Sequence, residues 1–331
     1  MTTSPEDSSS SATEVLVVIV NYNAGELLAR AVAAMKCQTF TGFRLIVVDN
    51  ASSDDSLVLL RGSHPETEVL PAGANLGFAA ANNLAVQRFR GSRWIALLNP
   101  DAFPEPDWLQ TLVEAAREDA GIAALASRTV DARDTTLLDG AGDAYHISGR
   151  YWRRGYHCAA QHRHEQREEI FAACAAAALY SRAAWEQVGG LDEDFFCYGE
   201  DVDLGFRLQL AGYRCLYVPT AVAYHYGSAV TGERSDFSTY YGQRNLVWVY
   251  FKNMPAMLLW PLLPYHLILN AAALLGCALR GQARVAFRAK VDAVRGIAGA
   301  WRKRSAIQRL RRASVARIWA LLAGGRPWPR C

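Results

Sequence analysis

Apolar runs and helical patterns alternate along the first hundred residues. Val15 to Val20 (VLVVIV) is continuously apolar and mostly β-branched, as in a strand buried on both faces of a sheet, and a helical pattern follows from Glu26 to Lys36. The cluster Ser52, Ser53 and Asp54 favours the start of a second helix. Further strands are predicted at Arg44 to Val48, weakly at Val69 to Leu70, and at Trp94 to Leu98, with helices from about Phe78 to Phe89 and from Pro106.

This βαβαβαβ order predicts an α/β fold with an open, doubly wound, Rossmann-like sheet that is mostly parallel and flanked by helices. Such sheets bind ligands beyond the carboxyl ends of their strands. Polar residues and glycine recur at these ends, as a nucleotide site requires: Asn21, Tyr22, Asn23, Asp49, Asn75, Gly77, Asn99 and Asp101. Neither GxGxxG after the first strand nor GxxxxGK[ST] occurs, so a dinucleotide fold and a P-loop are both unsupported.

The pattern is less regular after Asp101. Residues 139–155 are rich in Gly, Tyr and Arg and indicate a loop or a short sheet. Residues 157–169 form a polar stretch that is either an ordered lid or a mobile insert. Shorter apolar elements are predicted at Phe171 to Tyr180, Leu216 to Val218 and Ala221 to Tyr224, the last ending at His225.

The stretch from Gly189 to Arg207 (GGLDEDFFCYGEDVDLGFR) places six carboxylates within twelve residues, among two phenylalanines and a tyrosine. Ionised carboxylates beside apolar walls are costly unless a site uses them, so the segment indicates a pocket. A solvated loop followed by a helix start at Asp201 explains the same pattern. Asp203 and Arg207 are spaced i, i+4 and predict an ion pair on a helix.

The composition is that of a large domain with an appendage, because 51% of the 331 residues are hydrophobic. Residues 1–13 are Ser/Thr-rich without an apolar run and predict a disordered tail, neither a secretory signal nor a transit peptide. The seven cysteines are scattered and include no CxxC pair. A disulfide framework and a zinc site are therefore disfavoured, and a reducing cytosolic setting fits best.

Charge divides the chain into an acidic body and a basic tail. The net charge is +3, yet Arg280 to Cys331 carries 14 of the 35 basic residues and one of the 32 acidic residues. Before that tail, Ala256 to Leu279 has no charge over 24 residues, which is long enough for a membrane span. Because it contains two prolines, a buried helical hairpin or a segment in the bilayer interface is an equal alternative.

The arginine-rich segment from Arg302 to Arg317 also contains apolar residues at helical spacing. This pattern suits peripheral association with an anionic membrane, and it equally suits a solvated helix that packs on the acidic body. Binding of nucleic acid through the tail is a further alternative. It is not favoured, since the acidic body repels phosphates and the strand-end residues stay unexplained.

Two residues at predicted strand ends, Asp101 and His225, are suited to hold a divalent cation with positions left open for diphosphate oxygens. Manganese tolerates an imidazole ligand better than magnesium does. Glu200 and Asp201, at a predicted helix start, are candidates for a general base that takes a proton from an attacking hydroxyl. Adjacent helical residues point in different directions, so only one of the two can face the hydroxyl.

Six motifs in this order give the chain its resemblance to a known family: VVIVNYN, VVDNASSD, NLGFAAANN, LNPDAFPEPDWL, VGGLDEDFFCYGEDVDLGFRLQLAGYR and AYHYGS. From about Val15 to Gly227 the chain resembles family 2 glycosyltransferases with the A-type fold, especially the bacterial rhamnosyltransferase-like branch. The resemblance implies that Tyr22, Asn23, Asp49 and the loop Asn75 to Phe78, with Gly77, contact the nucleotide sugar. It also implies a metal motif at Asn99 to Asp101, a catalytic base at Asp201, and contact of His225 with the metal or diphosphate.

The chain departs from the family pattern at two points. Asn99 stands where the metal motif usually has an acid, so the cation depends mainly on Asp101, His225 and the diphosphate. The QxxRW motif of processive synthases is absent, and Gln243 to Trp248 does not satisfy its spacing. The expected domains are a catalytic domain over 14–231, with a nucleotide-binding half over 14–101 and an acceptor half over 102–231, and a helical basic region over 232–331.

The resemblance therefore implies inverting, non-processive transfer of one sugar, with rhamnose as the first choice, from a dTDP or UDP donor to a glycan or polyprenyl-linked acceptor. The cofactor is a divalent cation, Mn or Mg, and a basic residue such as Arg154 stabilises the departing diphosphate. The expected location is the cytoplasm, at the inner face of the cell membrane. A nucleotidyltransferase on a similar sheet is the alternative enzyme, but it would favour a glycine-rich basic loop after the first strand, which NYNAGE is not.

Overall fold

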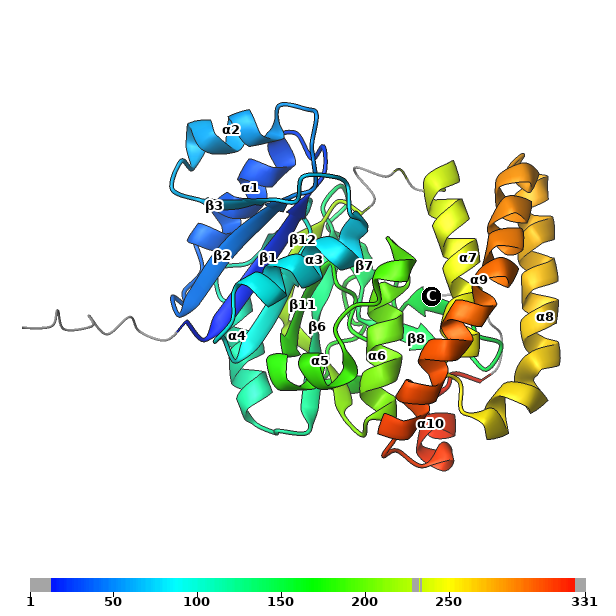
Figure 1. Ribbon diagram of the computed structural model, residues 1–331. Helices are drawn as coiled ribbons and strands as arrows, with labels where there is room; N and C mark the ends of the chain where they lie inside the picture. Colours follow the sequence, from blue (N-terminus) through cyan, green and yellow to red (C-terminus); the bar gives the residue numbers. More distant parts are fainter. Residues whose placement is uncertain (1–12, 228–231, 233, 325–331) are drawn as a thin grey trace, which may run out of the picture.

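The computed structural model describes residues 13–227, 232 and 234–324. The predicted disordered tail, residues 1–13, lies outside the described residues except for its last position. Figure 1 shows an α/β body to which a group of long helices is attached on one side. The elements of the amino-terminal half are β1 (Val15–Asn21), α1 (Glu26–Lys36), β2 (Phe43–Asp49), α2 (Ser56–Ser63), β3 (Glu68–Pro71), α3 (Gly77–Arg88) and β4 (Trp94–Leu98).

These elements confirm the predicted βαβαβαβ order. Strand β1 pairs in parallel with β2 and with β4, and β2 pairs in parallel with β3. All residues of β1 and β4 are buried, as their continuous apolar runs predict. Helix α2 begins at Ser56, where the carboxylate of Asp54 accepts the Ser56 amide at 3.2 Å, so the predicted Ser/Asp cluster does organise this helix start.

The second half adds antiparallel strands, which makes the sheet mixed. The ten-stranded sheet has the order β10-β12-β6-β11-β4-β1-β2-β3, with β5 paired to β12 and β7 paired to β6. One strand of twelve residues, β12, replaces the two short strands that were predicted, with an irregularity between Val218 and Val222. The elements are β5 (Ala102–Pro104), α4 (Trp108–Arg117), β6 (Ile122–Asp131), β7 (Leu138–Gly140), β8 (Asp143–Tyr145), β9 (Tyr151–Arg153), β10 (Glu168–Ile170), β11 (Ala177–Ser181), α5 (Arg182–Val188), α6 (Glu200–Leu210) and β12 (Arg214–His225).

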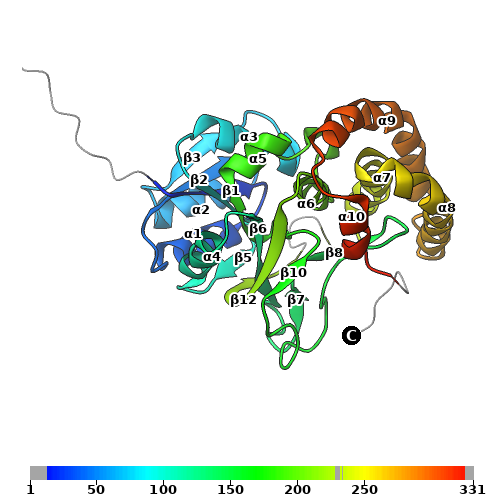
Figure 2. The same ribbon diagram turned by 90° about the horizontal axis from the view of Figure 1, so that it is seen from below.

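Both faces of the sheet are covered by apolar cores. Alternate residues of β1 point to opposite faces, so Leu16 and Val18 pack with α3, α5 and α6, whereas Val17 and Ile19 pack with α1 and α4. Figure 2 shows these helices on the two sides of the sheet. The strand ends are thereby left as the part of the sheet that can form a site.

The helical region packs on the body through a third core, in which Phe206 and Leu210 of α6 meet Tyr250, Met254 and other apolar side chains. It consists of α7 (Asp236–Asn253), α8 (Ala256–Leu279), α9 (Ala283–Leu310) and α10 (Val315–Leu321). Helix α8 is continuous despite its two prolines, so of the three alternatives for this segment the helical hairpin is wrong. By length and composition it is the one helix in the described residues that could cross a membrane.

The thiols of Cys37, Cys174, Cys197, Cys215 and Cys277 are free.

Candidate active site

A cavity of about 770 Å³ opens at the carboxyl ends of the parallel strands. Its walls come from the ends of β1 and β4, the start of α3, the acidic segment before α6, the end of β12 and the first turns of α7. Most of the residues that the sequence predicted for the site line it: Tyr22, Asn75, Gly77, Phe78, Asn99, Asp101, Glu200, Asp201 and His225. The fold thus brings together side chains that lie up to two hundred positions apart in the chain.

Two predicted residues, Asn23 and Asp49, lie outside the cavity lining and hold the strand ends in place. The Asp49 carboxylate accepts a hydrogen bond from Asn21 Nδ2 at 3.0 Å, and Asn23 Oδ1 accepts the amide of Ser53 at 2.8 Å. Asn50, which the sequence interpretation did not include in the site, does line the cavity. Its side chain donates to Asn75 Oδ1 at 3.0 Å and accepts the Leu76 amide at 2.8 Å, so it fixes the loop before α3.

The loop before α3 requires glycine at position 77. Gly77 has a φ of 80°, and a Cβ atom there would lie 2.5 Å from the ring of Phe196 and 2.6 Å from its carbonyl oxygen. The Phe78 amide donates to that same carbonyl oxygen at 2.7 Å. Phe196 itself has a φ of 64°, which is strained for an aromatic residue. This close approach fixes the predicted donor loop against the acidic segment.

The register of β5 and β12 brings Asp101 and His225 together. His225 lies opposite Ala102 in this antiparallel pair, and its Nε2 is 3.2 Å from the Asp101 carboxylate. Its other ring nitrogen, Nδ1, donates to Asp139 at 2.8 Å. All three side chains are buried. A carboxylate on the second ring nitrogen is the usual support of a histidine that binds a metal, so these residues fit a cation site.

The two carboxylates also control the protonation of His225. Burial by itself lowers the pKa of the imidazole, but Asp139 and Asp101 outweigh it and raise the pKa to about 9. Asn99 lies beside the same ring, with its Nδ2 at 3.3 Å from Nε2. Without a metal, the imidazolium balances the two acids. Asp139 gave no signal in the sequence, because it reaches the site from the short strand β7.

Asp201 and Glu200 begin α6 on the cavity wall. The Asp201 carboxylate accepts the amides of Ala175 at 3.1 Å and Val202 at 2.8 Å, which fixes its orientation. Burial raises the pKa of Asp201, and burial together with the charge of Asp201 raises that of Glu200 well above its ordinary value. Glu200 Oε2 is buried without a hydrogen-bond partner. A base with a raised pKa suits proton transfer near neutral pH.

The structure differs from the prediction for the basic residue of the site. Arg154 points away from the cavity, because it pairs with Glu168 at 2.5 Å and donates to the carbonyl of Ala141 at 3.1 Å. Its neighbour Arg153 lines the cavity and forms an ion pair with Asp139. The sequence could not separate two adjacent arginines without knowing that β9 ends at Arg153.

A second group of potential ligands lies beside the base. It consists of Asp143, Cys174 and Asp201, whose possible ligand atoms all lie within 4.8 Å of one another. In the described residues this is the only group of three or more His, Cys, Asp or Glu side chains placed closely enough to hold a metal ion together. Burial and the charge of Asp201 raise the pKa of Asp143 well above its ordinary value. Because Mn²⁺ and Mg²⁺ prefer oxygen ligands to a thiol, Asp101 and His225 remain the better pair for such a cation.

Most other carboxylates of the acidic run anchor the helical region. Asp203 pairs with Arg207 at 2.8 Å, as predicted, and also with Lys252 of α7 at 2.8 Å. Lys303 of α9 lies 2.6 Å from both Asp192 and Asp194. Asn245 of α7 donates to three backbone carbonyls of the run, those of Phe195, Cys197 and Tyr198. The acidic segment is therefore held from behind by α7 and α9; for α9 this is the predicted alternative of a basic helix that packs on the acidic body.

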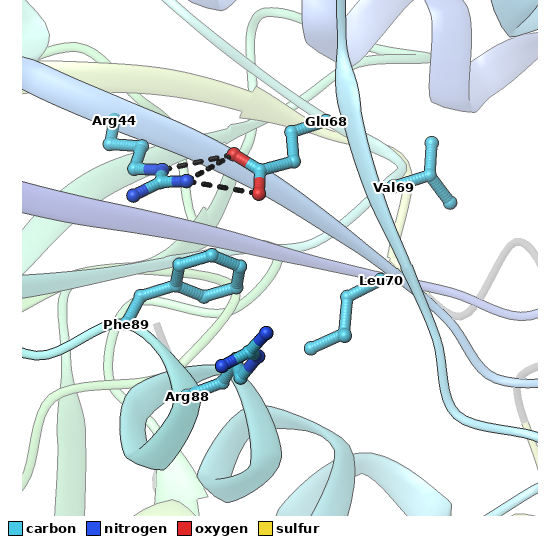
Figure 3. Close-up of a pocket in the computed structure, with 6 residues that line it drawn as sticks. All are labelled: Arg44, Glu68, Val69, Leu70, Arg88 and Phe89. Carbon is cyan, nitrogen blue, oxygen red and sulfur yellow. Dashed lines mark hydrogen bonds and ion pairs between the residues drawn. The ribbon is translucent and has the colours of Figure 1, made fainter.

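A smaller hollow of about 340 Å³ lies at the opposite edge of the sheet, near the beginnings of β2 and β3 (Figure 3). Arg44 donates two hydrogen bonds to Glu68 across it, at 2.9 and 3.0 Å. The two charges satisfy each other, and the hollow contains no other acidic residue. We therefore place the candidate site in the larger cavity at the strand ends.

Comparison with known proteins agrees with this placement. The family model described as glycosyl transferase family 2 matches residues 16–189. The chain is 31% identical over 245 residues to the N-acetylglucosaminyl-diphospho-decaprenol L-rhamnosyltransferase of Mycobacterium tuberculosis, covering 66% of this chain and 78% of that protein. It is 31% identical over 222 residues to the pre-mycofactocin glycosyltransferase of the same organism, covering 64% of this chain and 42% of that protein.

Two solved structures are similar in fold. The mannosyltransferase PcManGT from Pyrobaculum calidifontis, in complex with GDP-Man and Mn²⁺, aligns with a TM-score of 0.55 and 19% identity, covering 91% of this chain and 85% of that one. GalNAc-T7 with UDP, GalNAc and Mn²⁺ aligns with a TM-score of 0.58 and 17% identity, covering 73% and 48%. The fold is thus the A-type glycosyltransferase fold, with a helical region at the carboxyl-terminal end.

Proposed function

Because the chain belongs to glycosyl transferase family 2 and is therefore a glycosyltransferase, we propose that it moves one sugar from a nucleoside-diphosphate donor to a hydroxyl group of its acceptor. The attack inverts the anomeric carbon, and one sugar is transferred per encounter. The observation that carries the proposal is that Asp201 and the Asp101–His225 pair line the same cavity. A base and a diphosphate site are what such a transfer needs.

The nucleotide sugar enters over the ends of β1, β2 and β4. Tyr22, Asn75, Phe78 and Asn99 contact the nucleoside and its ribose, and Asn50 keeps their loop in position. Arg153, in place of Arg154, lies where it can offset the charge of the diphosphate. Arginine suits this role because its planar fork matches phosphate oxygens.

Asp101 and His225 would hold the divalent cation, with Asp139 supporting the imidazole from behind. When bound, the cation supplies Lewis-acid stabilisation of the diphosphate leaving group. The oxygen and nitrogen donors fit Mn²⁺, and Mg²⁺ fits less well. Support also comes from the two fold neighbours, both of which were solved with Mn²⁺.

Asp201 takes the proton of the acceptor hydroxyl while the hydroxyl oxygen attacks the anomeric carbon. The bond between that carbon and the diphosphate breaks on the opposite side, and the nucleoside diphosphate leaves. The two backbone amides on Asp201 hold its carboxylate in one orientation, so the base is positioned before the acceptor binds. Glu200, whose Oε2 has no partner, orients the acceptor.

The acceptor is a polyprenyl-linked glycan, and the sugar is rhamnose from a dTDP or UDP donor. Support comes from the relative whose name specifies rhamnosyl transfer to N-acetylglucosaminyl-diphospho-decaprenol. A lipid-linked acceptor requires the enzyme to work in the cytoplasm at the inner face of the membrane. Peripheral association with anionic lipids would serve this purpose, and no role for nucleic acid is proposed.

The test is a screen of dTDP-, UDP- and GDP-sugars with Mn²⁺ and with Mg²⁺, in which both products are measured. Release of a nucleoside diphosphate supports glycosyl transfer, and release of inorganic diphosphate would instead indicate a nucleotidyltransferase. Asp201→Asn should abolish turnover while donor binding stays nearly unchanged. Asp101→Ala should abolish the metal-dependent part of donor binding.

Asp107→Asn provides a matched control, because Asp107 is exposed and its side chain makes no cap hydrogen bond. It should retain full activity and donor binding. Substantial turnover by Asp201→Asn would move the base to Glu200 or refute the scheme. Donor binding by Asp101→Ala that is the same with and without a chelator would exclude the cation site.

A further inference from the structure

Exposed apolar side chains are concentrated on the helical region. Of the sixteen large apolar side chains that are exposed in the described residues, eleven belong to α8 and α9. On α8 they follow the outward face at helical spacing, and the helix contains no charged residue. The exposed large side chains of α8 are Met257, Trp260, Tyr265, Leu267, Ile268, Leu275 and Leu279. A continuous apolar face of this length marks an interaction surface.

The opposite side of α8 is attached to the body along its length. Leu259, Leu262 and Leu269 are buried, and Cys277 near the end of the helix is buried too. His266 stacks on Tyr250 with ring centroids 4.0 Å apart. Since a helix held in this way cannot cross a bilayer without leaving the body, α8 can contact a membrane only along its outward side.

Helix α9 extends the apolar face and adds positive charge. Its exposed Phe287, Val294 and Trp301 repeat every seven residues and so lie on one side of the helix. The ring centroids of Trp260 and Trp301 are 6.2 Å apart, which joins the two apolar stripes. Figures 1 and 2 both show α8 and α9 side by side at the edge of the molecule.

An arginine follows each of these three apolar residues of α9 by one position. Arg288, Arg295 and Arg302 are exposed and form a stripe beside the apolar one, and Arg309, also exposed, continues it at the same spacing of seven residues. Asp292 is the only acid of α9; it lies 3.1 Å from Arg295 and 3.8 Å from Arg288, but these two arginine side chains remain 76% and 79% exposed. An apolar face with tryptophans, bordered by arginines, is complementary to a bilayer interface that contains anionic headgroups.

We propose that the outward face of α8 and α9 docks on an anionic bilayer, with α8 lying in the plane of the interface. This face differs from the basic segment, Arg302 to Arg317, that the sequence suggested. Three basic residues of that segment contact the rest of the protein: Lys303 pairs with Asp192, Arg317 pairs with Glu169, and Arg304 donates to the carbonyl of Phe251. Those charges are engaged with the body. The bilayer contact therefore lies earlier in the chain, at residues 257–302.

The docking face is connected to the cavity through α7. Phe237, Ser238 and Tyr241 at the start of α7 line the cavity, while Tyr240 donates to Asp292 of α9 at 2.9 Å. Lys290 of α9 donates to the carbonyl of Gln243 at 2.6 Å. The wall of the cavity that α7 forms thus lies next to α9 of the docking face. The inference deepens the proposed function, because it names the surface through which a lipid-linked acceptor would be reached. It rests on the proposed function only for the lipid-linked nature of that acceptor.

The test is flotation of the full-length protein with vesicles of phosphatidylcholine alone and with vesicles containing about one third phosphatidylglycerol. The wild type should float with the anionic vesicles, and Ile268→Glu/Leu275→Glu should reduce the bound fraction by about tenfold or more, because it places two charges on the apolar face. Arg288→Gln/Arg295→Gln should weaken binding to anionic vesicles and remove the difference between the two compositions.

Val58→Glu is the matched control, since Val58 is an exposed apolar residue of α2, on the other side of the molecule. It should float as the wild type does. Quenching of Trp260 fluorescence by lipids brominated near the headgroup should exceed quenching by lipids brominated near the chain ends. Thermal melting of each variant confirms that the fold is retained.

Equal flotation of the wild type and Ile268→Glu/Leu275→Glu would overturn the proposal. So would resistance of the wild type to alkaline carbonate extraction, which would indicate a spanning α8. The proposal would also be overturned if the wild type formed a concentration-dependent dimer that the same two substitutions convert to monomer, because the face would then bind a second copy of the chain. Asp201→Asn should float normally, and Ile268→Glu/Leu275→Glu should still hydrolyse donor in solution, so failure of this proposal and failure of the transferase proposal are distinguishable.

Discussion

Lys252 of α7 lies with its Nζ 2.8 Å from the carboxylate of Asp203 in α6, and both side chains are almost completely buried. Asn253 donates to the same carboxylate at 2.7 Å. Burial lowers the pKa of Lys252, which Asp203 and Asp192 counteract. This contact joins the helical region to the helix that begins with the proposed base.

Removing the Lys252 charge should therefore destabilise the folded protein. Lys252→Met leaves Asp192 and Asp203 short of a buried cation, and we expect the free energy of unfolding to fall by about 3 kcal/mol or more. Lys303→Met removes a half-exposed lysine from the same acidic run and should cost about 0–1 kcal/mol. Urea unfolding of the two variants measures both values. Equal losses would mean that the buried pair has no special structural role.

Gly77→Ala should disrupt the donor loop, because the new Cβ would lie 2.5 Å from the Phe196 ring and would force the loop away from the acidic segment. We expect a loss of stability of about 2–4 kcal/mol and weaker donor binding. Gly73→Ala is the matched control: its φ of 77° is nearly the same, but nothing lies within 4 Å of the added Cβ.

Gly73→Ala should cost only about 1 kcal/mol and leave donor binding unchanged. Thermal melting and calorimetric titration with dTDP and UDP provide the two measurements. If both variants behave alike, backbone conformation alone, and not the contact with Phe196, explains the glycine at position 77.

Features that neighbouring residues encode could be predicted from the sequence, whereas contacts between residues far apart in the sequence could not. Strand β1 and the polar residues after it are encoded locally, in an apolar run followed by asparagine and tyrosine, and these were predicted. His225 and Asp139 are 86 positions apart, and Asp139 sits in a strand of three residues that no periodicity reveals. The same holds for Asn245 and Lys252, whose partners lie about fifty positions away in the acidic segment and in α6.

Arg153 and Arg154 offer a direct comparison of the sequence expectation with the structure. Arg153→Ala removes a charge from the cavity wall and the partner of Asp139, so donor affinity should fall by about tenfold or more. Arg154→Ala breaks a contact with the partly exposed Glu168 and should change donor affinity by less than about twofold. Calorimetric titration with UDP and dTDP in the presence of Mn²⁺ measures both affinities. A larger loss in Arg154→Ala would restore the original expectation.

His266 should make stability depend on pH between about 4 and 6.5. Burial lowers the pKa of its imidazole to about 4, although the hydrogen bond from Nδ1 to the Ser148 carbonyl opposes this shift. In the unfolded chain the pKa is near 6.5, so between these values the unfolded state binds more protons than the folded state. Stability is therefore complete above pH 6.5 and is lost as the pH falls towards 4, by up to about 3 kcal/mol from this residue.

His266→Gln should flatten this part of the profile, while His162→Gln should leave it unchanged because the His162 side chain is 91% exposed. Urea unfolding of the wild type, His266→Gln and His162→Gln is measured at pH 7.5, 6, 5 and 4.5; the lowest pH is about half a unit above the folded pKa. The difference between the pH profiles of the free energy of unfolding isolates the contribution of His266. Because the buried His266 of α8 stacks on Tyr250 of α7, loss of stability below pH 6 should begin with release of α8, which hydrogen exchange can follow. A wild-type profile identical to that of His266→Gln would show that the imidazole titrates normally and that α8 is not held at this point.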